Sequence, residues 1–112
     1  MASTATNSLI LSVLATAALT ANRAVSIGGT VPSSAATSFG IALTGGAIGD
    51  YVPVVVSGTA VATAGAAIAA GAAVEVGTTG KVVTKSAGIT IGRALAAAAA
   101  DGDQVEILLI GN

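Results

Sequence analysis

The sequence predicts an all-β fold, a small β-barrel or sandwich of about eight short strands with two short helical turns. The first observation behind this prediction is a repeated phrase: GDYVPVVVSG at Gly49–Gly58 recurs as GDQVEILLIG at Gly102–Gly111. The second is that the segments between turns either alternate between apolar and polar residues or are apolar throughout, as strands are.

Two further pairs of segments match in the same order along the chain. LTANRAVSI at Leu19–Ile27 aligns with IAAGAAVEV at Ile68–Val76, and SFGIAL at Ser38–Leu43 aligns with TIGRAL at Thr90–Leu95. The offsets between copies are 49, 52 and 53 residues, and the differences belong in loops, where added length costs little. The fold is therefore predicted to be built from two pseudo-repeats.

The length of 112 residues predicts a single domain, residues 1–112. Within it we expect a flexible N-terminal arm at residues 1–8, a first repeat at 9–58 and a second at 59–112. Two copies are too few for a solenoid, which needs about three repeats to bury its faces. A closed domain made of two similar halves is the simplest interpretation.

The first segment, 8–20, allows two interpretations. Its polar residues recur at helical spacing, whereas the repeat assigns Leu9–Leu14 to a strand, and we favour the strand. The polar stripe consists of Ser8, Ser12, Thr16 and Thr20.

A helical turn is predicted at Ala64–Ala70, where alanine is dense and Ile68 supplies an apolar anchor. Gly71 would end this turn, because glycine readily takes the left-handed conformation found after a helix. The first repeat has Asn22 at the matching place, and asparagine is the other residue that tolerates this conformation. The two positions are expected to share one backbone conformation.

The residues after these turns predict paired strands. Ala24–Ile27 and Ala73–Val76 alternate with period two, so that one face of each is apolar. Gly77–Gly80 then reads as a turn. Lys81–Lys85 (KVVTK) has charged ends and an apolar centre, a pattern typical of an exposed edge strand.

The last strand of each repeat, Tyr51–Val56 and Gln104–Ile110, is nearly continuous in apolar residues, which predicts burial on both faces. Pro53 has no N–H and cannot donate a ladder hydrogen bond. The first of these strands is therefore expected to lie at an edge or a bulge, or to be unpaired in the direction in which an N–H would point. Ala96–Ala100 is compatible with either a helical turn or a packed loop.

Charge and hydropathy exclude several classes of partner. Only 8% of the residues are charged, against about 25% in ordinary soluble domains, and the four cations are dispersed. No nucleic-acid partner is expected, because no basic patch exists. No membrane partner is expected either: as a helix, Leu9–Leu19 would span only ~16 Å of a hydrocarbon core of ~30 Å.

The candidate reactive residues predict no catalytic, cofactor-binding or metal-binding site. The chain has no cysteine or histidine, so nucleophile activation and most metal chemistry lack their usual residues. Asp101, Asp103 and Glu106 could suggest calcium, but their spacing does not match the twelve-residue calcium loop. Asp50 precedes a strand as Asp103 does, which favours a turn role for both.

Three other features also have a structural interpretation. Gly77–Lys81 resembles a phosphate loop only slightly, since Val82 stands where Ser or Thr is required, and a hairpin turn is favoured. Phe39 and Tyr51 are the only aromatic residues, which favours packing in the core or an interface over ligand stacking. Arg93 stands where the first repeat has Ile41. It is either an exposed strand residue or an interface residue, and exposure is favoured.

Three segments together resemble the small capsid decoration (cement) proteins of tailed bacteriophages, a β-rich family long known only as a domain of unknown function. They are FGIALTGGAIGDYVPV at Phe39–Val54, VSGTAVATAGAAIAAGAAVEV at Val56–Val76 and IGRALAAAAADGDQVEILL at Ile91–Leu109. The resemblance covers the chain from about Leu9 onward. It implies a non-enzymatic structural protein that binds the outer surface of an assembled head and bridges neighbouring major capsid protein subunits.

The resemblance also implies partners and a location. The expected partners are the major capsid protein and further copies of the chain, as a homotrimer or a dimer. The expected location is the capsid exterior of the virion, after synthesis in the host cytoplasm. Two alternatives stay open: a virion-surface adhesion module that binds host glycans, and a self-assembling fibre or shell subunit.

Overall fold

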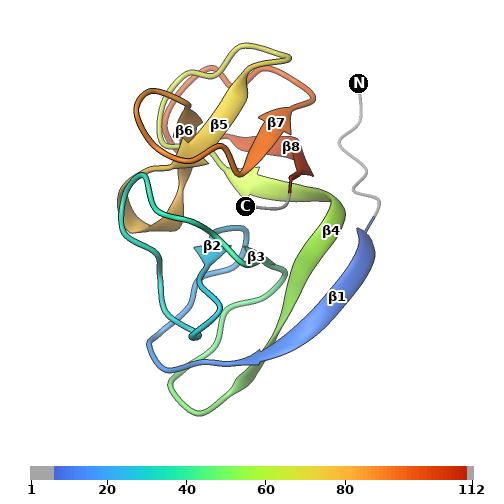
Figure 1. Ribbon diagram of the computed structural model, residues 1–112, viewed down its shortest axis with the longest axis vertical. Coiled ribbons are helices and arrows are strands. Elements are labelled where there is room, and N and C mark those ends of the chain that lie inside the picture. Colours follow the sequence, from blue (N-terminus) through green and yellow to red (C-terminus); the bar gives the residue numbers. More distant parts are fainter. Residues whose placement is uncertain (1–6, 111–112) are drawn as a thin grey trace.

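The computed structural model describes residues 7–110, except the side chains of Asn7 and Ser8. The chain forms eight strands and one short 3-10 turn, η1 (Figure 1). In chain order these are β1 (Asn7–Leu14), β2 (Ala24–Val25), β3 (Gly40–Ala42), β4 (Tyr51–Thr63), β5 (Ala73–Val76), η1 (Thr78–Gly80), β6 (Val82–Thr84), β7 (Gly92–Ala94) and β8 (Gln104–Leu109).

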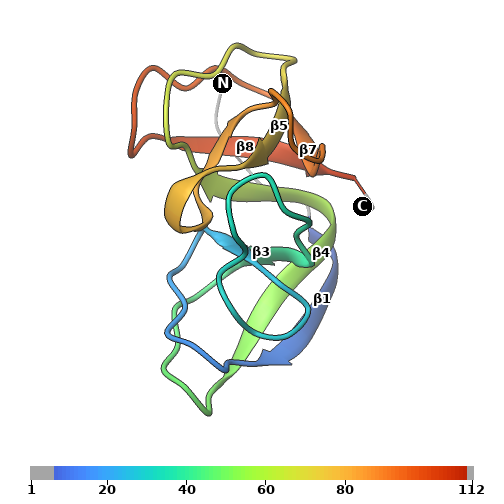
Figure 2. The same ribbon diagram turned by 60° about the vertical axis from the view of Figure 1, so that its left-hand side comes forward.

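The strands form one antiparallel sheet curled into a nearly closed barrel, which confirms the predicted all-β fold. The strand order is β2-β3-β4-β8-β7-β5-β6, and β1 pairs with β4. The long strand β4 runs from the half of the molecule that contains β1 into the half that contains β8 (Figures 1 and 2). It therefore belongs to both halves, and the predicted repeat boundary after residue 58 falls inside it.

The same backbone hydrogen bonds occur in both halves, displaced by the offsets of the sequence repeat. The Ala15 N–H donates to the Asp50 carbonyl at 2.8 Å, and the Ala64 N–H donates to the Asp103 carbonyl at 2.8 Å. Equivalent donor–acceptor pairs are Leu19–Gly46 with Ile68–Ala98, Asn22–Ala42 with Gly71–Ala94, and Leu43–Pro53 with Leu95–Glu106. The repeat in the letters is thus also a repeat of backbone geometry.

The helical turn predicted at Ala64–Ala70 is absent, and the prediction of two helical turns was wrong. Ala64 and Ile68 instead form isolated bridges to Val82 and Ala98. The Ile68 N–H and C=O are both bonded to Ala98, each at 2.9 Å, so they cannot join a helix. Alanine favours helix more than any other residue, but this local preference is small and is overridden by the long-range bonds.

The predicted conformation of Asn22 and Gly71 is confirmed although no helix precedes them. Their φ angles are 62° and 84°, both in the left-handed region. The strand interpretation of Leu9–Leu14 is also confirmed, and β1 begins earlier, at Asn7. The predicted arm at 1–8 thus overlaps β1, and its residues 1–6 lie outside the described part. The segment Ala96–Ala100 is a loop.

The edge prediction for Lys81–Lys85 holds for the strand order, in which β6 is last, but not for exposure, because Val82 is 0% exposed and its carbonyl accepts the Gly65 N–H at 2.8 Å. Pro53 pairs opposite Ser12 with no register shift, and β4 has neighbours on both sides, so Pro53 lies at neither an edge nor a bulge. Its carbonyl accepts the Leu43 N–H at 2.9 Å, one residue past the end of β3. Its nitrogen points to the same side, so the hydrogen bond that proline cannot donate would lie beyond the end of β3.

Two hydrophobic clusters lie on opposite faces of β3 and β4. Neighbouring residues of β4 separate them, because Val54 points into one cluster and Val55 into the other. The smaller cluster contains Val13, Ala15, Leu19, Val25, Ala42, Val52 and Val54. The larger contains Ala24, Ile41, Val55, Ala60, Ala62, Ala64, Ile68, Val74, Val76, Val82, Ile91, Ala94, Ala98, Val105 and Ile107. Small branched side chains thus supply the close packing that aromatic rings provide elsewhere.

Candidate interaction surface

The acidic residues are engaged in local structure. Asp50 Oδ2 accepts the Ala47 N–H at 2.9 Å, and Asp103 Oδ2 accepts the Ala100 N–H at 3.1 Å, in equivalent turns. Asp101 forms an ion pair with Lys81 at 2.9 Å. Across residues 7–110, no three side chains of the metal-ligating types gather into a cluster. Glu106 Oε2 accepts the Thr59 hydroxyl at 2.9 Å, so each of the acids considered for calcium has a separate structural partner.

The segment that resembled a phosphate loop connects the hairpin of β5 and β6, as favoured from the sequence. Gly77 donates to the Lys81 carbonyl at 2.6 Å, and Val76 pairs with Val82. Gly80 has a φ of 79°, which suits the tight turn. The Lys81 side chain points to Asp101 and is thus already engaged.

Glu75 is a buried carboxylate that fastens the loop between β6 and β7. Its Oε1 accepts the backbone N–H of Ser86 at 2.6 Å and of Gly88 at 3.0 Å. These two bonds, chiefly the bond from Ser86, lower the pKa of Glu75 below its ordinary value of 4.5, and the charge of Lys85 lowers it further. Burial opposes this shift without reversing it.

Acid is expected to weaken the domain through Glu75. Because the folded-state pKa is lowered, the stabilisation is complete above pH 4.5 and is lost as the pH falls through the folded value. Thermal unfolding followed between neutral pH and about pH 2 should show a steeper acid loss in the wild type than in Glu75→Gln. Identical acid limbs would contradict this role for Glu75.

Among the residues that the structure describes, 7–110, no helix could cross a membrane.

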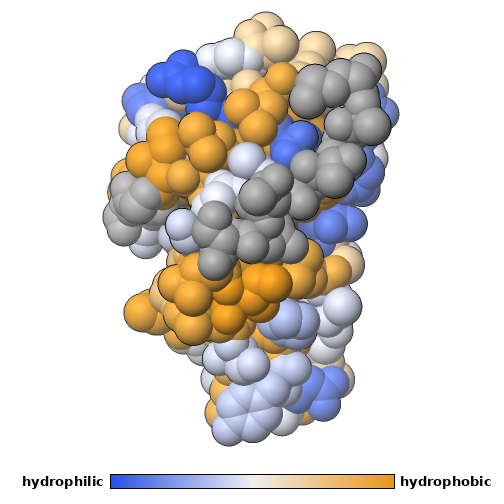
Figure 3. Space-filling model, turned by 90° about the vertical axis from the view of Figure 1, so that its right-hand side faces the viewer, coloured by the Kyte–Doolittle hydropathy of each residue, from blue (hydrophilic) through white to orange (hydrophobic). Residues whose placement is uncertain are grey.

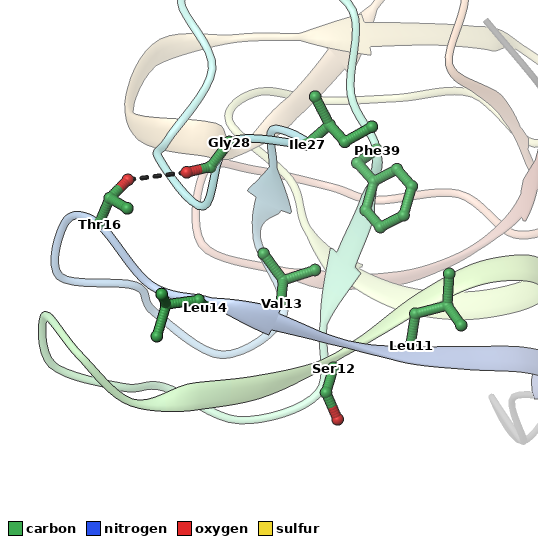
Figure 4. A pocket seen from close by; sticks show the side chains of 8 residues that line it. All are labelled: Leu11, Ser12, Val13, Leu14, Thr16, Ile27, Gly28 and Phe39. Carbon is green, nitrogen blue, oxygen red and sulfur yellow. Dashed lines mark hydrogen bonds between the residues drawn. The ribbon is translucent and has the colours of Figure 1, made fainter.

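Exposed apolar side chains gather in three places on the molecule. The side of the molecule formed by β1 shows a continuous hydrophobic patch (Figure 3). An open groove of about 450 Å³, which we call the groove, lies beside β1 (Figure 4). It is lined by Leu11, Ser12, Val13, Leu14, Thr16, Ile27, Gly28 and Phe39.

The loop that forms one wall of the groove is fastened to the end of β1. The Thr16 hydroxyl donates to the Gly28 carbonyl at 2.8 Å, and the Thr16 N–H donates to the Gly29 carbonyl at 3.0 Å (Figure 4). Gly29 has a φ of 82°, and a Cβ there would lie 2.0 Å from the Leu14 carbonyl oxygen. Only glycine allows this close approach, so the groove has a defined wall.

A second apolar surface, the β8 face, lies on β7 and β8. Arg93 pairs with Leu108, so their side chains point to the same side of the sheet, and strand alternation places two more apolar residues there. Arg93 is exposed, as favoured from the sequence, and donates to the Gly71 carbonyl at 2.8 Å. The β8 face consists of Arg93, Leu95, Leu108 and Ile110.

The third surface, the tip, consists of Ile48 and Tyr51 at the turn before β4. Both side chains are 72% exposed. The sequence left core or interface packing open for the two aromatic residues. Phe39 is half-buried against the smaller cluster, whereas Tyr51 is not in the core. No sequence signal distinguished these two rings, because each is a single aromatic residue beside apolar neighbours.

Comparisons with known proteins agree on the nature of the chain. Its fold is similar to that of the head fiber gp8.5 N base of bacteriophage phi29, with a TM-score of 0.75 and 18% sequence identity over 91% of this chain and 93% of that one. No curated protein sequence matches the chain. A family model described as phage cement protein matches residues 3–109. The chain therefore belongs to the phage cement protein family and is a structural protein of the phage capsid.

Proposed function

We propose that this cement protein binds the outer surface of the phage head and stabilises it by bridging neighbouring major capsid protein subunits. Family membership supports the capsid as the partner. The surface supports contact as the mode of action, because large apolar side chains are exposed on a chain with few charges. A homotrimer would multiply modest contacts into firm attachment.

The tip is the surface that we assign to the capsid contact. By the repeat, Tyr51 corresponds to Gln104 and Ile48 corresponds to Asp101, both of which are polar and exposed. The turn therefore folds equally well with polar side chains at these positions. This difference between otherwise equivalent turns is the single observation that carries the assignment.

Tyr51 has the properties of an interface anchor. A tyrosine ring adds a large apolar area with few rotatable bonds, and its hydroxyl can still bond to a polar rim. Ile48 adds an aliphatic side chain three residues earlier in the same turn. The two together suit a partner surface with an apolar pocket between subunits.

The assignment is tested with the variant Tyr51→Asp and capsids that lack this protein. We expect the affinity for these heads to fall by about 30-fold or more, because an interface anchor is replaced by a charge. The measurement is the number of copies bound per head as the protein concentration rises. Gln104→Asp, at the equivalent position of the second repeat, is the matched control and should bind as the wild type does. Full binding by Tyr51→Asp would refute the assignment.

A further inference from the structure

The groove of the first repeat corresponds to a surface that is buried in the second. Ile27 corresponds to Val76 through the offset of 49, yet Ile27 is 79% exposed and Val76 is 0% exposed. Leu11 corresponds to Ala60 in the same way, at 40% and 1%. Equivalent positions thus differ in burial because a neighbouring surface covers only the second set.

The surface that covers the second set is the outer face of the first repeat. Ile41 and Val55 belong to the same cluster as Ala60 and Val76. The cover is fastened by backbone bonds: the Thr63 N–H donates to the Asn22 carbonyl at 2.7 Å, and the Ala35 N–H donates to the Val76 carbonyl at 2.8 Å. Within the chain, therefore, the face of the first repeat that carries Ile41 and Val55 packs onto the face of the second repeat that carries Ala60 and Val76.

The counterpart of this covering face in the second repeat is the β8 face. Ile41 and Val55 correspond to Arg93 and Leu108, which pair with each other as Ile41 and Val55 do. Leu108 is nevertheless 42% exposed. Leu108 belongs to neither hydrophobic cluster, and Ile27 is open in the groove. Each molecule thus has one open acceptor surface and one exposed counterpart of the covering surface.

We propose that the β8 face of one copy docks into the groove of a second copy and repeats between molecules the contact made between repeats. Leu108 of one copy then covers Leu11 and Ile27 of the next. The Leu14 N–H, which corresponds to that of Thr63 and points away from β4, donates to the Gly71 carbonyl of the neighbouring copy.

The continuity of β4 supports this arrangement. Residues 51–56 of β4 correspond to β8, and residues 56–63 correspond to β1. Docking the copies in this way places the end of β8 at the start of the neighbour's β1, so that two strands from different molecules replace one continuous strand. Because the two surfaces differ, the interface is heterologous and closes into a ring or continues as a filament. A ring of three copies matches the proposed homotrimer.

Native mass spectrometry of the wild type, of two variants and of their mixture tests the interface. Leu108→Glu disables the covering face and Ile27→Glu disables the groove, so each variant alone should be monomeric where the wild type forms a discrete oligomer. Mixed in equal amounts, they should form a heterodimer, because one intact groove meets one intact β8 face. An isologous interface gives no such recovery.

Controls keep the result clear. Both residues are exposed, so both charged variants should keep the circular dichroism spectrum of the wild type, and the milder Leu108→Ala should weaken self-association about tenfold without a charge. Because Tyr51 lies opposite Leu14 of the groove, the control at the tip is Ile48→Asp, which should keep the wild-type oligomer while it weakens capsid binding, so that this interface and the proposed capsid contact can fail separately. A monomeric wild type, unchanged assembly of either charged variant, or no heterodimer in the mixture would overturn the proposal.

Discussion

Gly40→Ala is expected to destabilise the domain by about 3 kcal/mol, because it forces β3 away from β4. A Cβ at Gly40 would lie 2.2 Å from the Val55 carbonyl oxygen and 2.9 Å from its carbonyl carbon. Both atoms belong to the backbone of a central strand and cannot move aside as a side-chain end could. A Cβ at the equivalent Gly92 would lie 2.6 Å from the Leu108 carbonyl oxygen, so Gly92→Ala should be destabilising too.

Urea unfolding of the purified variants measures this effect. Gly28→Ala is the matched control, since its nearest atom would be 4.0 Å away and its φ is not positive. We expect that control to stay within about 0.5 kcal/mol of the wild type. If Gly40→Ala proves as stable as Gly28→Ala, the close approach of β3 to β4 is not as described.

Ile68→Ala is the second change with a large expected effect, a loss of about 3 kcal/mol in the free energy of unfolding. Ile68 is 2% exposed and lies in the larger hydrophobic cluster, held by its bridge to Ala98. Truncation removes apolar contacts and leaves a cavity that the surrounding strands cannot fill.

An exposed isoleucine provides the control for this substitution, because its truncation removes few packed contacts. Unfolding of Ile68→Ala should be compared with Ile48→Ala, an exposed isoleucine that should change stability by less than about 1 kcal/mol. Equal stabilities of these two variants would contradict the burial of Ile68.

The sequence predicted the β class because its repeat and its alternation are local signals. It also predicted the left-handed conformation at Asn22 and Gly71, since few residues tolerate that conformation. The helical turn predicted at Ala64–Ala70 is wrong for a physical reason. Its backbone bonds go to residues far along the chain, and alanine density does not record them.

The surfaces were harder to predict than the strands. Equivalent positions of the two repeats carry similar β-branched apolar residues, yet Val76 is buried and Ile27 is exposed. Nothing in the residue types distinguishes the two environments. Gly40 and Gly92 align in the repeat, but only the structure shows why both are glycine: a neighbouring strand lies too close for a Cβ. The functional class came from the resemblance to phage cement proteins, which the family match confirms.

A cryo-electron microscopy map of heads carrying this chain tests most directly the claim that the protein acts by contact with the capsid and with its own copies. The account predicts density on the outer surface of the head, with the Tyr51 tip against the capsid where neighbouring subunits meet. It also predicts that each groove is filled by the Leu108 side of the next copy. Copies that lie singly with open grooves, or whose tips point away from the capsid, would contradict it.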